Sequence, residues 1–191
     1  MSYPKKIDQQ TVMDAALALV EAHGEEHLSM RTLATELDVS ANALYRYYPN
    51  KAVLVNAVAD EAGHLLMRQI RDEAAGAIGL ASIGASALAY LRFARQRPHL
   101  YALKMRHCRT DQGGLASHQV LWAYVLGLVQ GLGSPWPQEE LAQGLWAFLH
   151  GLVELDRNGQ LEGHDPERTL QTGLAVFLAG MGLTPRPSAQ A

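Results

Sequence analysis

A chain of 191 residues, of which 48% are hydrophobic, is long enough to bury a real core, so it should fold as one sizeable domain or as one with a small appendage. Its single cysteine, Cys108, excludes an internal disulfide framework and the common multi-cysteine zinc sites, and it suits a reducing cytoplasm. The net charge of −3 gives no overall electrostatic argument for a nucleic-acid partner, so the placement of charges has to supply one.

The first residues predict a short polar arm. Ser2 to Lys6 holds a proline and two lysines, and it is interpreted either as a frayed terminus or as an arm that contacts phosphate or the minor groove of DNA. The start of the chain lacks the apolar core of a signal peptide, and no stretch reaches the roughly 18 apolar residues of a membrane span. We therefore expect a cytoplasmic protein with no membrane partner.

A first helix is predicted from about Asp8 to His23. Its apolar residues fall on one stripe, as expected for a helix that closes a small core, and Gly24 is placed to end it. The residues of this stripe are Val12, Ala15, Ala16, Leu19 and Val20.

The segment from Ser29 to Lys51, SMRTLATELDVSANALYRYYPNK, predicts a helix, a tight turn and a second short helix. Asp38 tolerates left-handed backbone in the turn, and the hydroxyls of Ser29 and Ser40 are expected to cap the two helices. Asn50 is expected to cap the helix that follows. Apolar residues occupy the positions of a helix-turn-helix core: Leu33, Ala34, Leu37, Val39 and Leu44.

The second short helix has an outer face that could meet a ligand, and Arg31 and Thr32 stand at the start of the first, where they could meet phosphate. The local charge does not favour DNA by itself, because up to Lys51 the chain holds five basic and seven acidic residues, or 5 − 7 = −2. The outer face would carry Ala41, Asn42, Tyr45, Arg46 and Tyr47.

The stretch VSANALYRYYPNKAVL resembles the signature of the TetR, or tetracycline-repressor-like, family of bacterial transcriptional regulators. The shared features are Val-Ser, then Leu-Tyr, an aromatic pair, and a lysine that opens the next helix, in this order. The sequence departs from the pattern at Asp38, where helix-turn-helix proteins often have glycine, and at Asn42, where many relatives have glycine. The second departure is expected to change which bases are read.

The resemblance implies a DNA-binding domain over residues 1–51, continuing into a linking helix from about residue 50, and a helical effector-binding and dimerisation domain over 52–191. It implies a homodimer on a palindromic operator in double-stranded DNA, most simply a repressor that a small apolar or aromatic effector releases, with activation as the alternative. A small-molecule-binding helical protein or an enzyme that keeps the helix-turn-helix only as a structural element is the other interpretation.

Family positions assign roles on the reading helix. Tyr45, Tyr47 and Lys51 match positions that grip the DNA backbone, whereas residues 41–43 sit where bases are met, and Asn42 alone among these three has the donor and acceptor needed to read adenine. Asn42 could instead stabilise the helix start near Ser40. The full set of expected DNA-contacting residues is Arg31, Thr32, Ser40, Ala41, Asn42, Ala43, Tyr45, Arg46, Tyr47 and Lys51.

The rest of the chain keeps helical spacing and shows no strand-like alternation, so the predicted fold class is all α. The expected helices run from Asn50 to about Ala75, from about Leu80 to Arg97, from Pro98 to Cys108, from Leu115 to Leu132, from Pro137 to Arg157 and from Asp165 to about Gly182. A loop is expected near Gly76 to Gly79 and a tail from Thr184 to Ala191.

The last two helices are expected to pair across a two-fold axis as a four-helix bundle, with Phe148 and Leu174 on the paired surface. Trp146, His150 and Gly151 resemble the WHG-type ligand-binding domain of some TetR-like proteins; a packing role is the first interpretation, with Gly151 permitting close helix approach. An effector pocket, or else ordinary core, is predicted at Leu66, Met67, Leu91, Tyr101, Met105, Trp122, Tyr124 and Trp146.

No other group predicts chemistry. The histidines lack metal-ligand spacing, no nucleophile and base are paired, and no cofactor or metal is expected. Cys108 lies among basic residues that would lower the pKa of a thiol, but it has no resolving cysteine. The basic run from Arg92 to Arg109 contains no carboxylate and is interpreted as a solvated face, with an anion-binding or DNA-facing role as the alternative.

Overall fold

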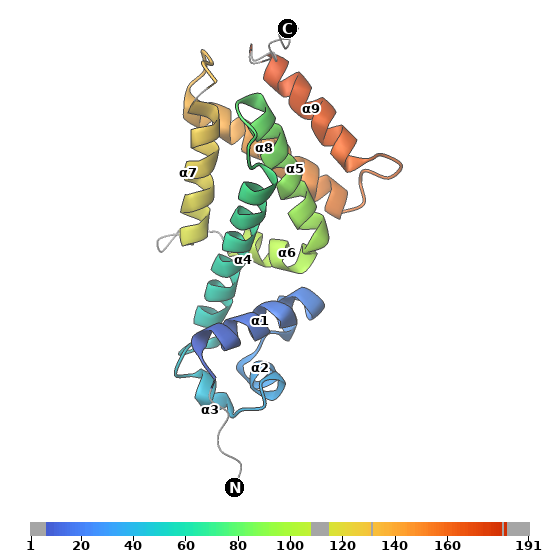
Figure 1. The fold of residues 1–191 in the computed structure, drawn as a ribbon. Helices are drawn as coiled ribbons and strands as arrows, with labels where there is room; N and C mark the ends of the chain where they lie inside the picture. The colour runs from blue at the N-terminus through green and yellow to red at the C-terminus, as the bar shows by residue number, and fades with distance from the viewer. Residues whose placement is uncertain (1–6, 108–114, 131, 181, 183–191) are drawn as a thin grey trace. The chain divides into compact units, whose positions relative to one another are not determined.

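The computed structural model describes residues 7–107, 115–130, 132–180 and 182, and every regular element among them is helical, which confirms the all-α prediction (Figure 1). The polar arm before Ile7, Cys108 with Arg109, and the C-terminal tail lie outside the described residues. The helices in chain order are α1 (Gln9–His23), α2 (Met30–Glu36), α3 (Ala41–Leu44), α4 (Lys51–Glu73), α5 (Leu80–Gln96), α6 (Pro98–Arg106), α7 (Ala116–Gln130), α8 (Gln138–Arg157) and α9 (Pro166–Gly180), with a 3-10 turn η1 (Glu25–His27) after α1.

Side-chain caps set the first helix boundaries where the sequence predicts them. Asp8 precedes α1 and its Oδ1 accepts a hydrogen bond from the Thr11 N–H at 2.7 Å, which lowers the pKa of the carboxyl. Gly24 ends the helix with a φ of +86°, a conformation that glycine adopts without a Cβ penalty. Ser29 caps α2, since its Oγ accepts from the Thr32 N–H at 3.0 Å.

The chain divides into two compact units, of which the first holds Met1–Leu66 and Gln96–Gln119. Its core gathers apolar side chains from α1, α2, α3 and the first half of α4, joined by Leu100 and Leu103 of α6. The helix-turn-helix therefore shares its core with α6, which begins 54 residues after the end of α3, and the unit extends past the expected domain boundary at Lys51.

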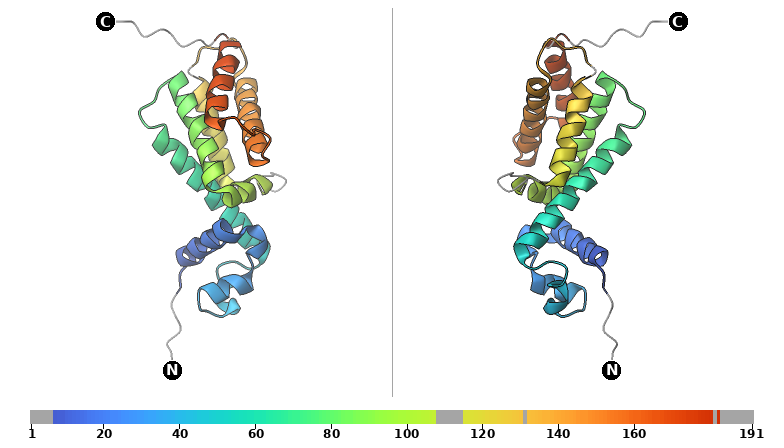
Figure 2. Two further views of the ribbon diagram at one scale, coloured as in Figure 1. Left: turned by 90° about the vertical axis from the view of Figure 1, so that its right-hand side faces the viewer. Right: turned by 90° about the vertical axis from the view of Figure 1, so that its left-hand side faces the viewer.

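The second unit, Met67–Arg95 and Val120–Ala191, contains the end of α4, most of α5 and α7, and α8 and α9. Helices α8 and α9 lie side by side in all views (Figures 1 and 2). Arg92 of α5 ties the unit together, because its guanidinium bonds to Glu167 at 2.9 Å, at the start of α9, and to Glu73 at 3.2 Å, at the end of α4.

The basic run is exposed at Arg95, His99 and Arg106, as a solvated face would be, but Lys104 within it is only 1% exposed. Most of the described cations on either side of Lys104 pair with carboxylates from distant parts of the chain. The pairs are Arg92 with Glu73 and Glu167, Arg95 with Asp156 at 3.4 Å, Arg97 with Glu21 at 3.6 Å, and Arg106 and His107 with Glu25. The run contains no carboxylate because its partners come from other helices.

Candidate nucleic-acid interface and ligand pocket

The turn between α2 and α3 has the geometry that the sequence predicts. Asp38 has a φ of +56°, the left-handed conformation that few residues other than glycine, asparagine and aspartate adopt readily. Backbone bonds close the turn, with the Val39 N–H donating to the Ala34 carbonyl at 3.0 Å. Leu33, Leu37 and Leu44 are buried beneath it, and Val39 is half-buried. The turn therefore fixes the direction in which α3 leaves α2.

Helix α3 presents polar side chains over one buried anchor. Leu44 is fully buried, whereas Asn42 and Arg46 are exposed and Tyr45 is 48% exposed. Ala41 and Ala43 are half-buried. Small side chains beside an exposed amide let the helix backbone approach a flat or grooved partner closely, as a helix in the major groove must.

The cap expected at the start of α3 is absent. Ser40 is the residue before the helix, but its side chain makes no capping hydrogen bond to the backbone. Its hydroxyl is exposed, so it stays available to an external acceptor. The next cap is present as expected, because the Asn50 Oδ1 accepts from the Val53 N–H at 2.9 Å and leaves Lys51 exposed in the first turn of α4.

Of the three tyrosines that follow α3, Tyr47 and Tyr48 point into the domain. The Tyr47 hydroxyl donates to the Ile7 carbonyl at 2.5 Å, so its proton is engaged within the unit and anchors the residue before α1. Tyr48 is 3% exposed and belongs to the core. To donate a hydrogen bond to phosphate, as the family position implies, the Tyr47 hydroxyl would have to leave the Ile7 carbonyl. No local pattern in the sequence predicts this contact with Ile7.

Two positions at the start of α2 also remain open to solvent. Arg31 and Thr32 are exposed, and the Thr32 hydroxyl shares a 2.7 Å hydrogen bond with the Ser29 hydroxyl. The acidic residues that give the first 51 positions their negative charge are partly used internally, since Glu21 and Glu25 pair with Arg97, Arg106 and His107. Arg31, Arg46 and Lys51 have no such partner among the described residues.

A buried polar contact joins α4 to the start of α7, and sequence reasoning missed it. The Asp60 Oδ1 accepts a hydrogen bond from the Ser117 N–H at 2.8 Å, so a side chain 57 residues away caps α7. Ser117 is fully buried against Gly63, where an added Cβ would lie 2.1 Å from the serine Oγ. His118 follows Ser117 in the chain. Burial and the charge of nearby Lys104 lower the pKa of His118, so its imidazole is mainly neutral at pH 7.

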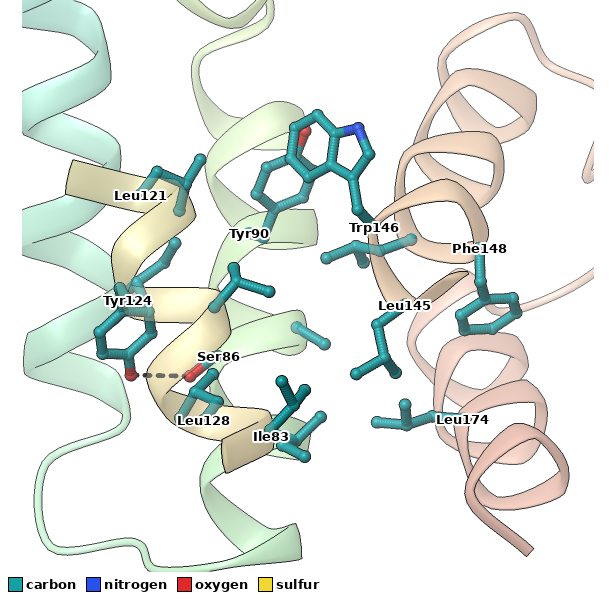
Figure 3. A pocket seen from close by; sticks show the side chains of 15 residues that line it. Ile83, Ser86, Tyr90, Leu121, Tyr124, Leu128, Leu145, Trp146, Phe148 and Leu174 are labelled. Carbon is teal, nitrogen blue, oxygen red and sulfur yellow. Dashed lines mark hydrogen bonds between the residues drawn. The ribbon is translucent and has the colours of Figure 1, made fainter. Parts of the chain in front are cut away.

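The second unit contains a pocket among α4, α5, α7, α8 and α9 (Figure 3). The volume of its cavity is about 60 Å³, which exceeds the roughly 10–15 Å³ that one water needs. Its lining is mostly apolar, and its polar groups are the hydroxyls of Ser86 and Tyr124, 2.9 Å apart, the hydroxyl of Tyr90 and the indole N–H of Trp146. The lining residues are Ile70, Ile83, Ser86, Ala87, Tyr90, Leu121, Tyr124, Val125, Leu128, Val129, Leu145, Trp146, Phe148, Leu149 and Leu174.

Two of the eight residues predicted for an effector pocket, Tyr124 and Trp146, line this one. Four others are core residues at most 2% exposed, and Met105 and Trp122 are half-buried outside the lining. Those four core residues are Leu66, Met67, Leu91 and Tyr101. The prediction chose large aromatic and sulfur side chains, whereas the lining consists mainly of leucine, valine and isoleucine, which the sequence does not distinguish from ordinary core.

The Trp146 to Gly151 motif divides into two parts. Trp146 meets Tyr90 edge-on with ring centroids 5.7 Å apart and stacks on His150 at 5.5 Å, so the ring lies at the pocket and has packing partners as well. Within the chain no helix approaches Gly151 closely, because nothing lies within 4 Å of a Cβ built there. Gly173 permits a close approach instead: its missing Cβ would lie 2.5 Å from the Phe148 ring.

Phe148 and Leu174 do not lie on a free helix surface as expected. Phe148 lines the pocket and stacks on Phe177 with ring centroids 6.1 Å apart, and Leu174 is 7% exposed. The exposed side of α8 and α9 instead carries small and apolar residues. These are Ala147, Gly151 and Leu155 on α8 and Thr172, Ala175, Val176 and Ala179 on α9, a set that we call the outer face.

The described residues form neither a metal site nor a membrane-spanning helix. No cluster of three or more histidine, cysteine, aspartate or glutamate side chains there has the arrangement of a metal site. None of the described helices is both long enough and apolar enough to cross a bilayer.

Comparison with known proteins gives matches at both ends of the chain. Residues 12–58 match the family model described as bacterial regulatory proteins, tetR family, and residues 83–177 match the model described as tetracyclin repressor-like, C-terminal domain. These names do not test the WHG-type assignment.

Individual proteins give matches of different extent. The HTH-type transcriptional repressor KstR of Rhodococcus jostii is 41% identical over 61 residues, which cover 31% of this chain and 29% of that protein. The HTH-type transcriptional repressor DrrR1 of Streptomyces coeruleorubidus is 30% identical over 85% of this chain and 56% of its own length. A protein of unknown function from Rhodococcus sp. RHA1 shares the fold, with a TM-score of 0.83 at 21% identity over 94% of this chain and 99% of that one.

Proposed function

The chain belongs to the tetR family of bacterial regulatory proteins, and we propose that it is a dimeric, sequence-specific DNA-binding repressor that a small effector releases from a palindromic operator. The family consists of DNA-binding transcriptional regulators that are generally dimeric and respond to small molecules. Repression rather than activation is favoured because KstR and DrrR1 are both named as repressors. We propose the cytoplasm as its site of action, because DNA lies there in bacteria.

One observation carries the DNA-binding part of this proposal. A left-handed Asp38 and a buried Leu44 hold α3 so that Asn42, Tyr45 and Arg46 project from it into solvent. A rigid reading helix with exposed donors is what entry into the major groove requires. Within the proposal, Ala41, Asn42 and Ala43 meet base edges. Arg31, Thr32, Ser40, Tyr45, Arg46, Tyr47 and Lys51 position the domain through phosphates.

The dimer is proposed to form through the outer face. Ala147, Gly151 and Ala175 have small side chains that allow two helix pairs to approach closely, and Val176 is 69% exposed. Nothing within its own chain lies near Gly151, so a second copy of α8 could pack against it. An isologous contact of this kind gives the two-fold symmetry that a palindromic operator matches.

The apolar pocket is proposed as the effector site. Ile70 of α4 is among its lining residues, and α4 begins at Lys51 directly after the reading helix. An effector that fits only one orientation of α4 would shift the population toward it and change how the reading heads are spaced. The proposal includes the DNA-contacting residues, the pocket residues, a DNA-binding domain over residues 1–51 and an effector-binding and dimerisation domain over 52–191.

Selection of duplex DNA from a random pool by the purified protein tests the proposed function. The expected product is a palindrome with two half-sites centred about one helical turn apart or a multiple of it. A variant with Asn42, Tyr45 and Arg46 replaced by alanine is the control, because these exposed side chains contribute little to the core. Enrichment of no motif by the wild-type protein, or of the same motif by the control, would contradict the proposal.

A further inference from the structure

The pocket lining contains no carboxylate, ammonium, guanidinium or imidazole group. No aspartate, glutamate, lysine, arginine or histidine is among the residues that line it. A charged group placed there would lose its hydration without gaining a counter-ion, which costs far more than a single polar contact returns. The lining therefore favours a neutral ligand with mostly apolar surface.

The hydroxyl pair determines what kind of polar group such a ligand can carry. The Ser86 hydroxyl donates to the Ser82 carbonyl at 2.7 Å, which uses its only proton. Its oxygen lies 2.9 Å from the Tyr124 oxygen, so the proton between them belongs to Tyr124. Both hydroxyl protons are then engaged within the protein. What remains at Tyr124 is the acceptor capacity of its oxygen.

The opposite side of the pocket is aromatic. Tyr90 and Trp146 close it with rings in edge-to-face contact, and in Figure 3 the indole nitrogen lies on the far side from the hydroxyl pair. Ring faces and edges accommodate apolar ligand atoms without a strong directional demand. Tyr90 and Trp146 also carry an O–H and an N–H, and both residues have further interactions within the protein. The hydroxyl pair of the lining lies at the Ser86–Tyr124 end.

We propose that the pocket takes a neutral, largely apolar ligand that donates one hydrogen bond, an aliphatic alcohol or a phenol, to the Tyr124 oxygen. The proposal rests on the proposed effector role of the pocket. A ketone or an ether of the same size has only acceptors and would face the Tyr124 oxygen without a proton between them, and a carboxylate would add an unpaired charge.

Isothermal titration calorimetry with three probes of similar length tests the chemical class on the full-length protein. 1-Octanol should bind about five-fold more tightly than 2-octanone, the difference expected from one net hydrogen bond, and octanoate should bind more weakly than either. Flexible chains are suitable because they adapt to an irregular apolar space.

Two variants separate the hydroxyl pair from general packing. Tyr124→Phe removes the acceptor, so octanol should fall to the level of octanone while octanone stays unchanged. Ser86→Ala removes the acceptor of the Tyr124 proton, so the Tyr124 hydroxyl becomes free to donate to a ligand. The affinity for octanone should then rise, and the difference between the octanol and octanone affinities should become smaller. Thr35→Val, which removes an exposed hydroxyl of α2 outside both proposed sites, is the control and should leave all three affinities unchanged.

Equal affinity of the wild-type protein for octanol and octanone, an octanol preference that survives in Tyr124→Phe, or no measurable binding of any probe would overturn the proposal. These results are independent of the DNA-binding role, because that role is measured with duplex DNA and no probe. A protein that selects an operator but ignores octanol would refute the ligand class alone. A protein that binds octanol but selects no operator would refute the proposed function alone.

Discussion

At the scale of single residues, the reading helix separates side chains that hold structure from side chains that are free to meet a partner. Leu44 and Tyr48 are buried, and the Tyr47 proton is bonded to Ile7. Asn42 is exposed and makes no hydrogen bond with the helix start. The interpretation of Asn42 as a local stabiliser of the turn therefore has no contact to support it, which strengthens its assignment to base reading.

Asn42→Ala and Lys51→Ala should consequently fail in different ways. Asn42→Ala should relax selectivity at one position of each half-site by roughly 1–3 kcal/mol, because a bidentate contact to adenine is lost. Lys51→Ala should weaken all duplexes alike and flatten the salt dependence, because only a phosphate contact is lost. Titration of operator variants at two salt concentrations distinguishes them. A melting curve of each variant serves as control, and unchanged base preference in Asn42→Ala would refute its assignment.

At the scale of elements, the helices and their ends follow closely from the sequence. Asp8, Gly24, Ser29 and Asn50 bound helices where predicted, and α8 runs from Gln138 to Arg157 as expected. These boundaries depend on capping groups a few residues away, so a local pattern contains the needed information. Ser40 is an exception, because it precedes α3 as predicted but its side chain makes no capping hydrogen bond to the backbone.

Contacts between elements could not be predicted in this way. The cap of α7 comes from Asp60, the basic run finds its carboxylates on α1, η1, α4, α8 and α9, and the pocket is built from aliphatic residues of five helices. Periodicity shows that a residue is buried but not which helix it faces. For this reason only Tyr124 and Trp146 of the predicted pocket residues line the pocket, and Phe148, predicted on the paired surface, lines it as well.

The contact between α4 and α7 makes a prediction at this scale. Gly63→Ala should lower the free energy of unfolding by about 1–3 kcal/mol, because the new methyl would overlap the Oγ and Cβ of Ser117, 2.1 and 2.6 Å away. The double variant Gly63→Ala with Ser117→Gly should recover much of that loss, since both overlapping atoms are removed. Urea unfolding of the wild-type protein, the two single variants and the double variant measures the coupling energy between the two positions. Strictly additive changes in the free energy of unfolding would show that the added methyl group does not clash with Ser117.

The junction of α4, α5 and α9 predicts a response to acid. The hydrogen bond from Arg92 lowers the pKa of Glu167 below its ordinary value of 4.5, so the contribution of this pair to stability is present above pH 4.5 and is lost as the pH falls through the folded-state pKa. Glu167→Gln should therefore melt below the wild-type protein at pH 7, and the difference in melting temperature should vanish once the pH falls below the folded-state pKa of Glu167. Glu162→Gln, at an exposed position, should not change this profile. A constant difference at all pH values would contradict the assignment.

At the scale of the whole molecule, the proposed dimer depends on the outer face rather than on the residues that the sequence suggested. Val176→Glu should weaken dimerisation and leave the melting temperature of the monomer nearly unchanged, because Val176 is 69% exposed in the single chain. Phe148→Glu should instead destabilise the fold, since it places a charge against the pocket and Gly173. Ile78→Glu, 84% exposed in the segment between α4 and α5, is the control.

Sedimentation velocity at micromolar concentration gives the assembly state of each variant. The wild-type protein and Ile78→Glu should sediment as dimers, and Val176→Glu should shift toward the monomer. The operator affinity of Val176→Glu should also fall, because a monomer cannot bind both half-sites at once as a dimer does. A monomeric wild-type protein would refute the dimer, and a fully dimeric Val176→Glu would refute the outer face as its surface.

The central claim is that α3 reads a DNA sequence, and fluorescence anisotropy with the selected duplex and a scrambled duplex of the same composition tests it most directly. At one fixed salt concentration the account predicts binding to the selected duplex at least about a thousand-fold tighter, with two protomers per duplex at saturation. Equal affinity for the two duplexes would contradict the account, because the attraction would then be that of any basic surface for phosphate.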